Sequence, residues 1–427
     1  MAARDNSTVG NAPERTAKTN TGKPRVLFVS HSASRNGATI LLLEFLRWLR
    51  PRVDWDIEIL VHGSGALLDE FRPLGRTIVW RDPAPRLDSL LPRSFARVRR
   101  GIEAAYARVA LPSGPYDLVY ANTTATAPLI AALAGRARTV LWHVHELDYA
   151  IASTLTKPAW MECFRSAARF VAVSDAVRHA LIANHGIDAG RIDLVHGFIE
   201  ARLLGPDALR ARRERVRTAL GIRADAFVVG ACGSLGWRKG SDLFLQIAQR
   251  AAAAAPNAHI QFLWVGGTPG ERAALEFDHD MRRLGLASRC RLVPTTPDVL
   301  DHYCAMDAFA LTSREDPFPL VVLEAAEHGV PTVCFDAAGG ANEFVAGDAG
   351  VQVPYLDVDA FARQLLALRD DTARARTLGA CAQAKVRQAH HIDAQAPKLL
   401  HAVQDGLVQP PRAAGSGEPP LATPHVR

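Results

Sequence analysis

The chain has 427 residues, with 50 Lys and Arg against 44 Asp and Glu, and its formal net charge at pH 7 is +6. Hydrophobic residues make up 48% and charged residues 22% of the sequence, which excludes a wholly disordered or collagen-like chain. No stretch reaches the roughly 18 uninterrupted apolar residues of a membrane-spanning helix. The length allows two or three domains with a large buried core.

The two ends of the chain and its cysteines indicate the cellular compartment in which we expect the protein. Residues 1–24 are polar and lack the apolar block of a signal peptide, and residues 408–427 are rich in Pro, Gly and Ala, so we expect both to be disordered tails. The six cysteines form no C-x-x-C pair, and several lie in apolar runs. We therefore expect buried free thiols in a reducing cytoplasm, without a disulfide framework or structural zinc.

Short apolar runs alternate with helical patterns along the first half of the chain. The runs that we expect to be strands are residues 25–30, 57–62, 77–80, 117–122, 139–146, 169–174 and 191–197. Residues 39–49 have the apolar stripe of a helix. Near-continuous apolar strands separated by helices indicate a parallel sheet covered on both faces.

The alternation stops at residues 200–225, an Arg-rich stretch without an obvious strand, and restarts at residue 226. We therefore predict two doubly wound, Rossmann-like α/β domains, residues 25–204 and 205–389, that face each other across a cleft. A C-terminal helix at residues 390–407 is expected to pack back on the first domain. Ligands of such sheets bind beyond the carboxyl ends of the strands.

A glycine-rich loop, GSLGWRKG at residues 233–240, follows an expected strand and precedes an expected helix that Ser241 and Asp242 could cap. Glycines allow close backbone approach, and Arg238 and Lys239 add two cations beside a helix N-terminus, which favours anions. A diphosphate site fits this pattern. A surface turn with two solvated charges fits it equally well.

A second motif, SREDPFPLVVLE at residues 313–324, follows the run AFALTS and enters a helix. Asp316 lies on its loop and Glu324 about a turn into the helix, where a half-buried carboxylate needs partners. A carboxylate can accept the two hydroxyls of a ribose or hexose diol. The free N–H groups of Phe318 and Leu320 could face a phosphate or sugar hydroxyl. Helix capping by Asp316 and a solvated Glu324 are the alternative.

Residues 313–335 resemble the signature region of the retaining glycosyltransferases of family 4, which have the GT-B fold. The family motif is Glu, seven residues, Glu; Asp316 stands at the first Glu and Glu324 at the second. The resemblance implies that Glu324 binds the nucleotide ribose and that the Asp316 loop touches the donor sugar. Pro319, which has no N–H, stands where the family has Gly.

Further matches cover most of residues 25–385. Residues 233–240 resemble the family's cationic loop at the donor diphosphate: Lys239 matches its Lys, whereas Ser234 occupies the place of its Arg, for which Arg238 is a candidate substitute. Gly37 matches an N-terminal glycine that approaches the donor phosphate or the acceptor. His145 matches a histidine that contacts the donor sugar, and Glu343 matches a carboxylate near the sugar.

The patterns typical of metal sites have structural explanations. Asp-x-Asp occurs at residues 54–56, 278–280 and 357–359: before an expected strand, on a charged helix face and at a helix cap. His143 and His145 lack a third ligand nearby in the sequence. We therefore expect no metal and no cofactor.

Two Arg clusters raise the local charge. The first is on an expected helix at residues 94–110, whose apolar stripe favours an ordinary packed helix; contact with an anionic membrane, which would suit a lipid-linked acceptor, is the alternative. The second lies at residues 210–217. Neither cluster has the interleaved aromatic platforms on which bases stack, so we expect no nucleic acid partner.

The expected activity is transfer of a sugar, with retention, from a nucleoside-diphosphate sugar to a glycan or lipid-linked acceptor in cell-surface polysaccharide or glycolipid synthesis. Lys239 and Arg238 would stabilise the leaving diphosphate. The expected place is the cytoplasm, with the inner face of the membrane as an alternative. Two other functions stay open: a GT-B epimerase or phosphorylase, and a non-catalytic nucleotide-sugar-binding or scaffold protein.

Overall fold

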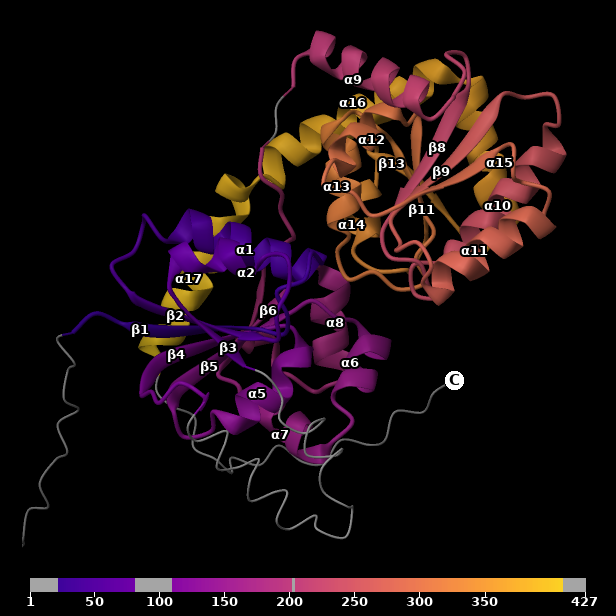
Figure 1. Cartoon of the computed structure of the whole chain (residues 1–427). Helices are drawn as coiled ribbons and strands as arrows, with labels where there is room; N and C mark the ends of the chain where they lie inside the picture. Colours follow the sequence, from indigo (N-terminus) through magenta and orange to yellow (C-terminus); the bar gives the residue numbers. More distant parts are fainter. Residues whose placement is uncertain (1–21, 81–109, 202–203, 410–427) are drawn as a thin grey trace, which may run out of the picture.

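The computed structural model describes residues 22–80, 110–201 and 204–409. They form two lobes, each with a parallel sheet between layers of helices (Figure 1), so the predicted fold class of two Rossmann-like α/β domains is confirmed. Most of the expected helix at residues 94–110 and most of both expected tails lie outside the described residues. None of the described helices combines the length and apolarity that crossing a membrane requires.

The N-terminal lobe has a seven-stranded sheet in the order β3-β2-β1-β4-β5-β6-β7. Its strands are β1 (Arg25–Ser30), β2 (Asp56–His62), β3 (Arg76–Trp80), β4 (Tyr116–Asn122), β5 (Ala137–Val144), β6 (Arg169–Ala172) and β7 (Ile192–Leu194). Its helices are α1 (Gly37–Leu49), α2 (Leu68–Phe71), α5 (Ala127–Ala132), α6 (Asp148–Thr154), α7 (Pro158–Ser166) and α8 (Asp175–Ala183), with 3-10 turns η1 (Arg72–Leu74), η3 (Thr124–Thr126) and η4 (Ala189–Arg191).

The C-terminal lobe has a six-stranded sheet in the order β10-β9-β8-β11-β12-β13. Its strands are β8 (Phe227–Cys232), β9 (Ile260–Val265), β10 (Cys290–Val293), β11 (Ala308–Leu311), β12 (Thr332–Phe335) and β13 (Gly350–Val353). Its helices are α9 (Pro206–Ala219), α10 (Ser241–Ala254), α11 (Arg272–Arg283), α12 (Val299–Ala305), α13 (Leu320–Glu327), α14 (Ala341–Val345), α15 (Val358–Asp370) and α16 (Thr372–Ala389).

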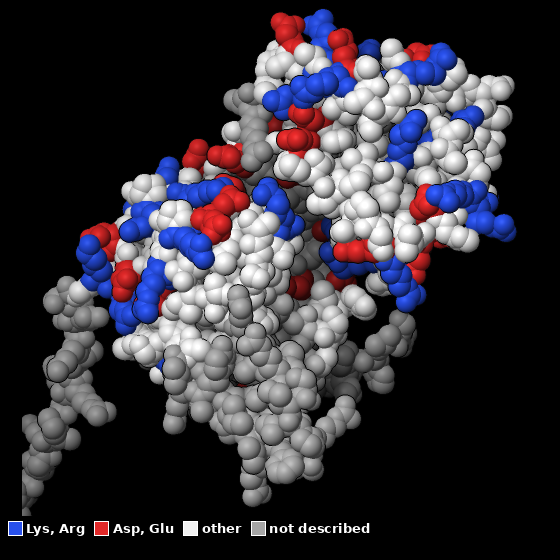
Figure 2. Space-filling model, viewed as in Figure 1, with Lys and Arg blue, Asp and Glu red and all other residues white. Residues whose placement is uncertain are grey.

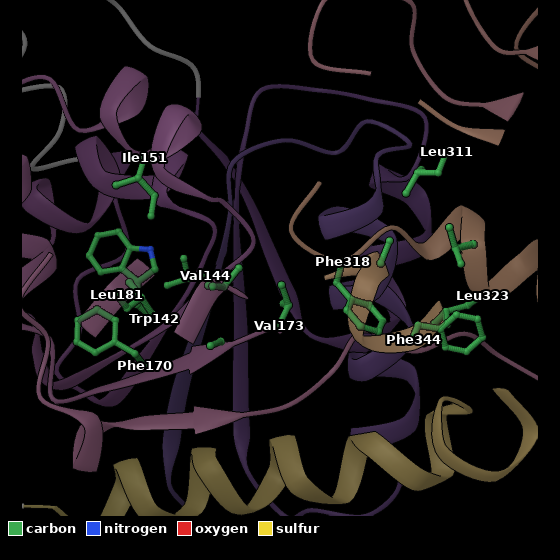
Figure 3. Close-up of a cluster of buried hydrophobic side chains, with 14 of the residues drawn as sticks. Trp142, Val144, Ile151, Phe170, Val173, Leu181, Leu311, Phe318, Leu323 and Phe344 are labelled. Atoms are coloured by element: carbon green, nitrogen blue, oxygen red, sulfur yellow. The ribbon is translucent and has the colours of Figure 1, made fainter. Parts of the chain in front are cut away.

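Buried apolar side chains fill the space on both faces of each sheet. In the N-terminal lobe, α1 and the last helix, α17 (Ile392–Val408), cover one face. Trp142, Phe164 and Phe170 lie in the core of the other face. Figure 3 shows that this second core continues toward the C-terminal lobe, where Phe318 and Phe344 belong to the same cluster. Apolar packing therefore joins the two lobes.

Local sequence explains where several helices begin. Asn36 accepts a hydrogen bond from the Thr39 N–H at 3.0 Å and starts α1, and Ser174 does the same for α8 through the Val177 N–H at 3.1 Å. Asp357 caps α15 through the Ala360 N–H at 2.8 Å. This contact of Asp357 is the helix-capping role that the sequence predicted for the Asp-x-Asp at residues 357–359.

The chain crosses between the lobes twice, before α9 and again between α16 and α17 (Figure 1). The two crossings are hydrogen-bonded to each other: the Ile199 N–H donates to the His390 carbonyl and the Ile392 N–H donates to the Ile199 carbonyl, both at 3.0 Å. This pairing ties the only two covalent links between the described lobes into one short hinge.

The Arg-rich stretch after the first crossing is the helix α9, which the sequence did not predict. Asp307 accepts hydrogen bonds from Arg213 and, at 2.7 Å, from Arg217; Arg217 also donates to the Ala305 carbonyl. The second Arg cluster thus holds α9 on the C-terminal lobe. Figure 2 shows Lys and Arg interspersed with Asp and Glu over the visible face of both lobes.

Candidate active site

The glycine-rich loop between β8 and α10 lies against the loop that precedes α13. Three of its glycines have positive φ angles: Gly233, Gly236 and Gly240. A Cβ on Gly240 would lie 2.0 Å from the Thr312 carbonyl oxygen, so only glycine permits this approach. The Arg314 N–H donates to the Arg238 carbonyl at 2.9 Å, and the Thr312 hydroxyl to the Lys239 carbonyl at 3.0 Å. The two motifs found in the sequence are therefore joined by backbone contacts.

The start of α10 differs from the expectation. Gly240, in the left-handed conformation, occupies the cap position, and no side chain caps the helix. The Ser241 hydroxyl instead accepts a hydrogen bond from the Gly236 N–H at 3.1 Å, and Asp242 pairs with Arg314 at 2.8 Å. These residues fix the glycine loop and the neighbouring loop, which is a different role from helix capping.

Lys239 and Asp316 form a buried ion pair between the two motifs. The Lys239 Nζ lies 2.5 Å from Asp316 Oδ2, and the two side chains are 17% and 6% exposed. The Ser313 hydroxyl donates to the same carboxylate oxygen at 3.2 Å. Asp316 does not cap α13, because the cap position is Pro319 and no side chain caps that helix. The alternative of helix capping by Asp316 is therefore wrong.

Glu324 lies on α13 and is half-buried, as predicted, with Tyr303 of α12 donating to its Oε2 at 2.7 Å. Burial raises the pKa of the neighbouring Cys232 thiol to about 12; the Glu324 charge raises it further, whereas the Lys239 charge opposes the shift. Glu324 and Lys239 therefore both lie near Cys232, the last residue of β8. A carboxylate and an ammonium group are therefore both close to this carboxyl end of the C-terminal sheet.

The residues at and just before the start of α13 have two unpaired backbone donors. Among the described residues, no oxygen accepts a hydrogen bond from the N–H of Phe318 or Leu320. The Phe318 ring is buried beside His196, with ring centroids 5.3 Å apart. Leu320 Cδ1 lies 3.9 Å from the position that a Cβ on Gly37 would take. The N-terminal glycine and the start of α13 thus face each other across the lobes.

His145 and Glu146 follow β5 on the opposite wall. Glu146 accepts hydrogen bonds from the backbone N–H groups of Thr124, at 3.1 Å, and His145, at 3.0 Å. Burial raises the pKa of Glu146 to about 7, although these bonds and the charge of Arg238 oppose the rise. Arg238, which belongs to the other lobe, therefore lies close enough to act on this carboxyl group.

Family models match both lobes of the chain. Residues 35–203 match the model described as glycosyltransferase family 4, and residues 226–371 match the model described as glycosyl transferases group 1. The chain belongs to the family 4 glycosyltransferases.

Curated relatives of the chain include two D-inositol 3-phosphate glycosyltransferases. The protein from Kribbella flavida is 29% identical over 224 residues, which are 51% of this chain and 52% of the relative. That from Catenulispora acidiphila is 32% identical over 228 residues, 50% of this chain and 52% of the relative. The chain thus spans about half the length of the curated relatives it matches.

Solved structures show the same GT-B arrangement. Anabaena HepE in complex with UDP and glucose aligns with a TM-score of 0.72 at 23% identity and covers 90% of this chain and 100% of its own. Sucrose-phosphate synthase from Thermosynechococcus elongatus aligns with a TM-score of 0.66 at 20% identity, covering 90% and 99%. At these identities the likeness establishes the fold.

Glu343, the predicted carboxylate near the sugar, lies where the lobes touch. It accepts hydrogen bonds from the N–H groups of Asp175 and Ala176, both at 2.9 Å, and its Oε2 lies 3.1 Å from His196 Nε2. Asp175, His196 and Glu343 offer ligand atoms within 4.8 Å of one another, the one such group of three among the described residues. Because Glu343 already accepts these bonds, a cation would have to displace contacts between the lobes.

Ser234 and Arg238, the other two residues predicted for the cationic loop, differ in their surroundings. Ser234, at the place of the family Arg, is exposed. Arg238 donates to the Glu315 carbonyl at 2.9 Å, so part of its guanidinium is occupied within the C-terminal lobe. Arg238 is thus the cation next to Lys239 in this loop, and its charge also acts to lower the pKa of Glu146 in the N-terminal lobe.

Sequence reasoning missed three contributors to this site: Asn122, Glu146 as a backbone acceptor, and Tyr303. Asn122 ends β4, so the rule that polar residues after buried strands line the site would have found it. Tyr303 comes from α12, for which no strong helical pattern exists.

Proposed function

We propose that this chain is a retaining, metal-independent glycosyltransferase that moves a sugar from a nucleoside-diphosphate sugar to a glycan or lipid-linked acceptor, in the synthesis of cell-surface polysaccharide or glycolipid. The observation that carries the proposal is the buried Lys239–Asp316 pair, with Glu324 and Lys239 both acting on Cys232 at the carboxyl end of the C-terminal sheet. The six free cysteines support a cytoplasmic site of reaction.

In the proposed reaction the bond between the anomeric carbon and the diphosphate breaks, and negative charge grows on the leaving diphosphate. The Lys239 ammonium, held in place by Asp316, stabilises that charge more in the transition state than in the ground state. The free N–H groups of Phe318 and Leu320 add donors at the start of α13. Glu324 would hold the ribose hydroxyls, and Tyr303 orients its carboxylate.

The comparisons support the donor class. HepE, which has the same fold, binds UDP-glucose, and the curated relatives are named for glycosyl transfer to D-inositol 3-phosphate. We therefore take UDP-glucose as the first donor to test and include D-inositol 3-phosphate among the acceptors. His145 and Gly37, on the N-terminal wall, would contact the sugar and the acceptor side.

The test is acceptor-dependent release of nucleoside diphosphate from a panel of nucleotide sugars, with the product's anomeric configuration read by NMR. Lys239→Ala is expected to lower turnover by about 100- to 1000-fold, the usual effect of removing one preorganised donor at a developing anion. Arg272→Ala, on the solvent face of α11, serves as the matched cation control and is expected to keep full turnover. Near-normal turnover of the Lys239→Ala protein would contradict the proposal.

A further inference from the structure

The end of strand β4 places an amide side chain against the histidine of the candidate site. Asn122 is fully buried and ends β4, which pairs in parallel with both β1 and β5. His145 follows β5 directly, so both residues lie at the carboxyl edge of the N-terminal sheet. The Asn122 Oδ1 lies 3.1 Å from His145 Nε2.

The other end of the amide fixes which atom faces His145. The Asn122 Nδ2 donates to the Ala38 carbonyl, in the first turn of α1, at 3.1 Å. A carbonyl oxygen can only accept, so the amide nitrogen must point to Ala38 and the amide oxygen to His145. An amide oxygen also only accepts, so the proton of the contact with His145 must be on the imidazole Nε2.

The imidazole is neutral, because burial lowers the pKa of His145 to about 3 and the nearby His31 lowers it further. A neutral imidazole carries one proton, so with Nε2 protonated Nδ1 keeps its lone pair. The half-buried His145 has no hydrogen bond to Nδ1 from any residue that the structure describes. The atom left over for a ligand is therefore an acceptor.

We propose that Asn122 is a positioning residue that holds the His145 imidazole in the tautomer with its proton on Nε2, so that Nδ1 accepts a hydrogen bond from a hydroxyl of the bound sugar. The inference rests on the proposed function and assigns the direction of one hydrogen bond in it: the sugar hydroxyl donates and His145 Nδ1 accepts. His143, whose ring centroid is 4.1 Å from that of His145, is held separately, because its Nδ1 is hydrogen-bonded to the Tyr120 hydroxyl.

The first experiment reads the tautomer in the full chain without substrate. Long-range ¹H–¹⁵N NMR on protein labelled at histidine distinguishes a protonated from an unprotonated ring nitrogen, and the His145→Gln variant identifies the signals. We expect a protonated Nε2 and an unprotonated Nδ1 at neutral pH. A proton on Nδ1 in the unmodified protein would overturn the inference whatever the variants do.

The second experiment asks whether Asn122 acts through His145. Asn122→Leu removes the acceptor, and we expect about a 10- to 100-fold loss of transfer, the range found when partners that orient metal-bound histidines are removed. The same substitution in a His145→Gln background should cost almost nothing more, because the two residues act as one unit. If Asn122 had only a structural role, Asn122→Leu would instead lower transfer by the same factor in both backgrounds. That result would contradict the inference.

The controls separate this inference from the proposed function. Asn184→Leu removes an exposed amide bonded to Asp148 and should leave transfer unchanged. If no nucleotide sugar supports transfer, the proposed function fails, while the NMR measurement still decides the tautomer. An active enzyme with a proton on Nδ1 would overturn the inference alone. If Asn122→Leu does not fold, the spectrum of the unmodified protein remains decisive.

Discussion

At the scale of single residues, the Lys239–Asp316 pair serves both the structure and the proposed chemistry. Two charges this deeply buried are costly to desolvate, and they are tolerated because they compensate each other. Removing one partner leaves the other charge without compensation. Activity and stability should therefore respond differently to single and double substitutions.

We expect Lys239→Ala to lower the free energy of unfolding by about 3–5 kcal/mol, the usual effect of leaving a buried charge unpaired. In Lys239→Ala with Asp316→Asn most of this loss should return, because no buried carboxylate is left, whereas transfer should stay low. Urea unfolding and the transfer assay measure the two effects. If the double variant is no more stable than the single one, the pair does not have the structural role that we assign to it.

Individual residues also show how far the sequence could predict the site. The order of motifs predicted that Lys239, Asp316 and Glu324 belong to segments that follow expected strands of the second domain, and the structure places these segments near one another. It could not predict that Asp316 pairs with Lys239, because that contact joins two loops 77 positions apart and depends on how they pack. The tautomer that we propose for His145 likewise depends on the hydrogen bond from the Asn122 amide to the Ala38 carbonyl, which joins residues 84 positions apart.

At the scale of elements, two carboxylates of the C-terminal lobe accept hydrogen bonds from the first turns of N-terminal-lobe helices. Glu343 accepts two backbone bonds from α8, and Glu315 accepts bonds from the N–H groups of Tyr149 at 3.2 Å and Ala150 at 3.4 Å, in α6. A helix N-terminus favours negative charge, so both contacts hold the lobes together.

Glu343→Gln should weaken the contact between the lobes, because it removes the charge that favours the start of α8. We expect an increase in the radius of gyration measured by small-angle X-ray scattering without donor, and a higher KM for the donor. Glu276→Gln, an exposed carboxylate on α11, is the control and should change neither. An unchanged radius and an unchanged KM would show that this contact does not control closure.

The helix α9 shows where sequence patterns mislead at this scale. In the sequence its arginines form a basic cluster, which suggests an exposed charged surface. In the structure the Arg217 side chain is buried and donates to the Ala226 carbonyl and to Asp307. The partners lie up to 90 positions away, so charge counting along the chain could not reveal them. The alternation of apolar strands and helices, in contrast, is local and predicted both sheets.

Arg217→Leu should therefore destabilise the C-terminal lobe by about 3–5 kcal/mol, since Asp307 and several buried carbonyls lose their donor. Differential scanning calorimetry measures the loss. Arg210→Leu is the matched control, because the Arg210 side chain is exposed on the same helix. This substitution should leave the temperature of the unfolding transition unchanged. Equal effects of the two substitutions would contradict the assigned role of Arg217.

At the scale of the whole molecule, buried histidines make stability depend on pH. Burial lowers the pKa of His145 to about 3 and of His390 to about 4, and it lowers that of His143 well below its usual value. These groups stay neutral when folded but take up protons near pH 6.5 when unfolded. Glu146 acts the other way, because burial raises its pKa to about 7.

Between about pH 6.5 and pH 4 the unfolded chain carries three protons at these histidines that the folded chain lacks. The folded chain carries one extra proton, at Glu146. The unfolded chain therefore binds more protons in this range. We expect the free energy of unfolding to fall as the pH is lowered through this range, by about 1.4 kcal/mol per pH unit for each net proton. Urea titrations at several pH values measure the slope, and His390→Gln should reduce it. Constant stability from pH 7 to pH 5 would contradict this account.

The most direct measurement for the proposed function is the structure of the chain with a nucleotide sugar or a nucleoside diphosphate from a panel that includes UDP, GDP and ADP. We expect the diphosphate at Lys239 and the start of α13, the ribose hydroxyls at Glu324, and the sugar toward His145 on the opposite lobe. A nucleotide bound elsewhere, or no binding of any member at millimolar concentration, would contradict the central claim.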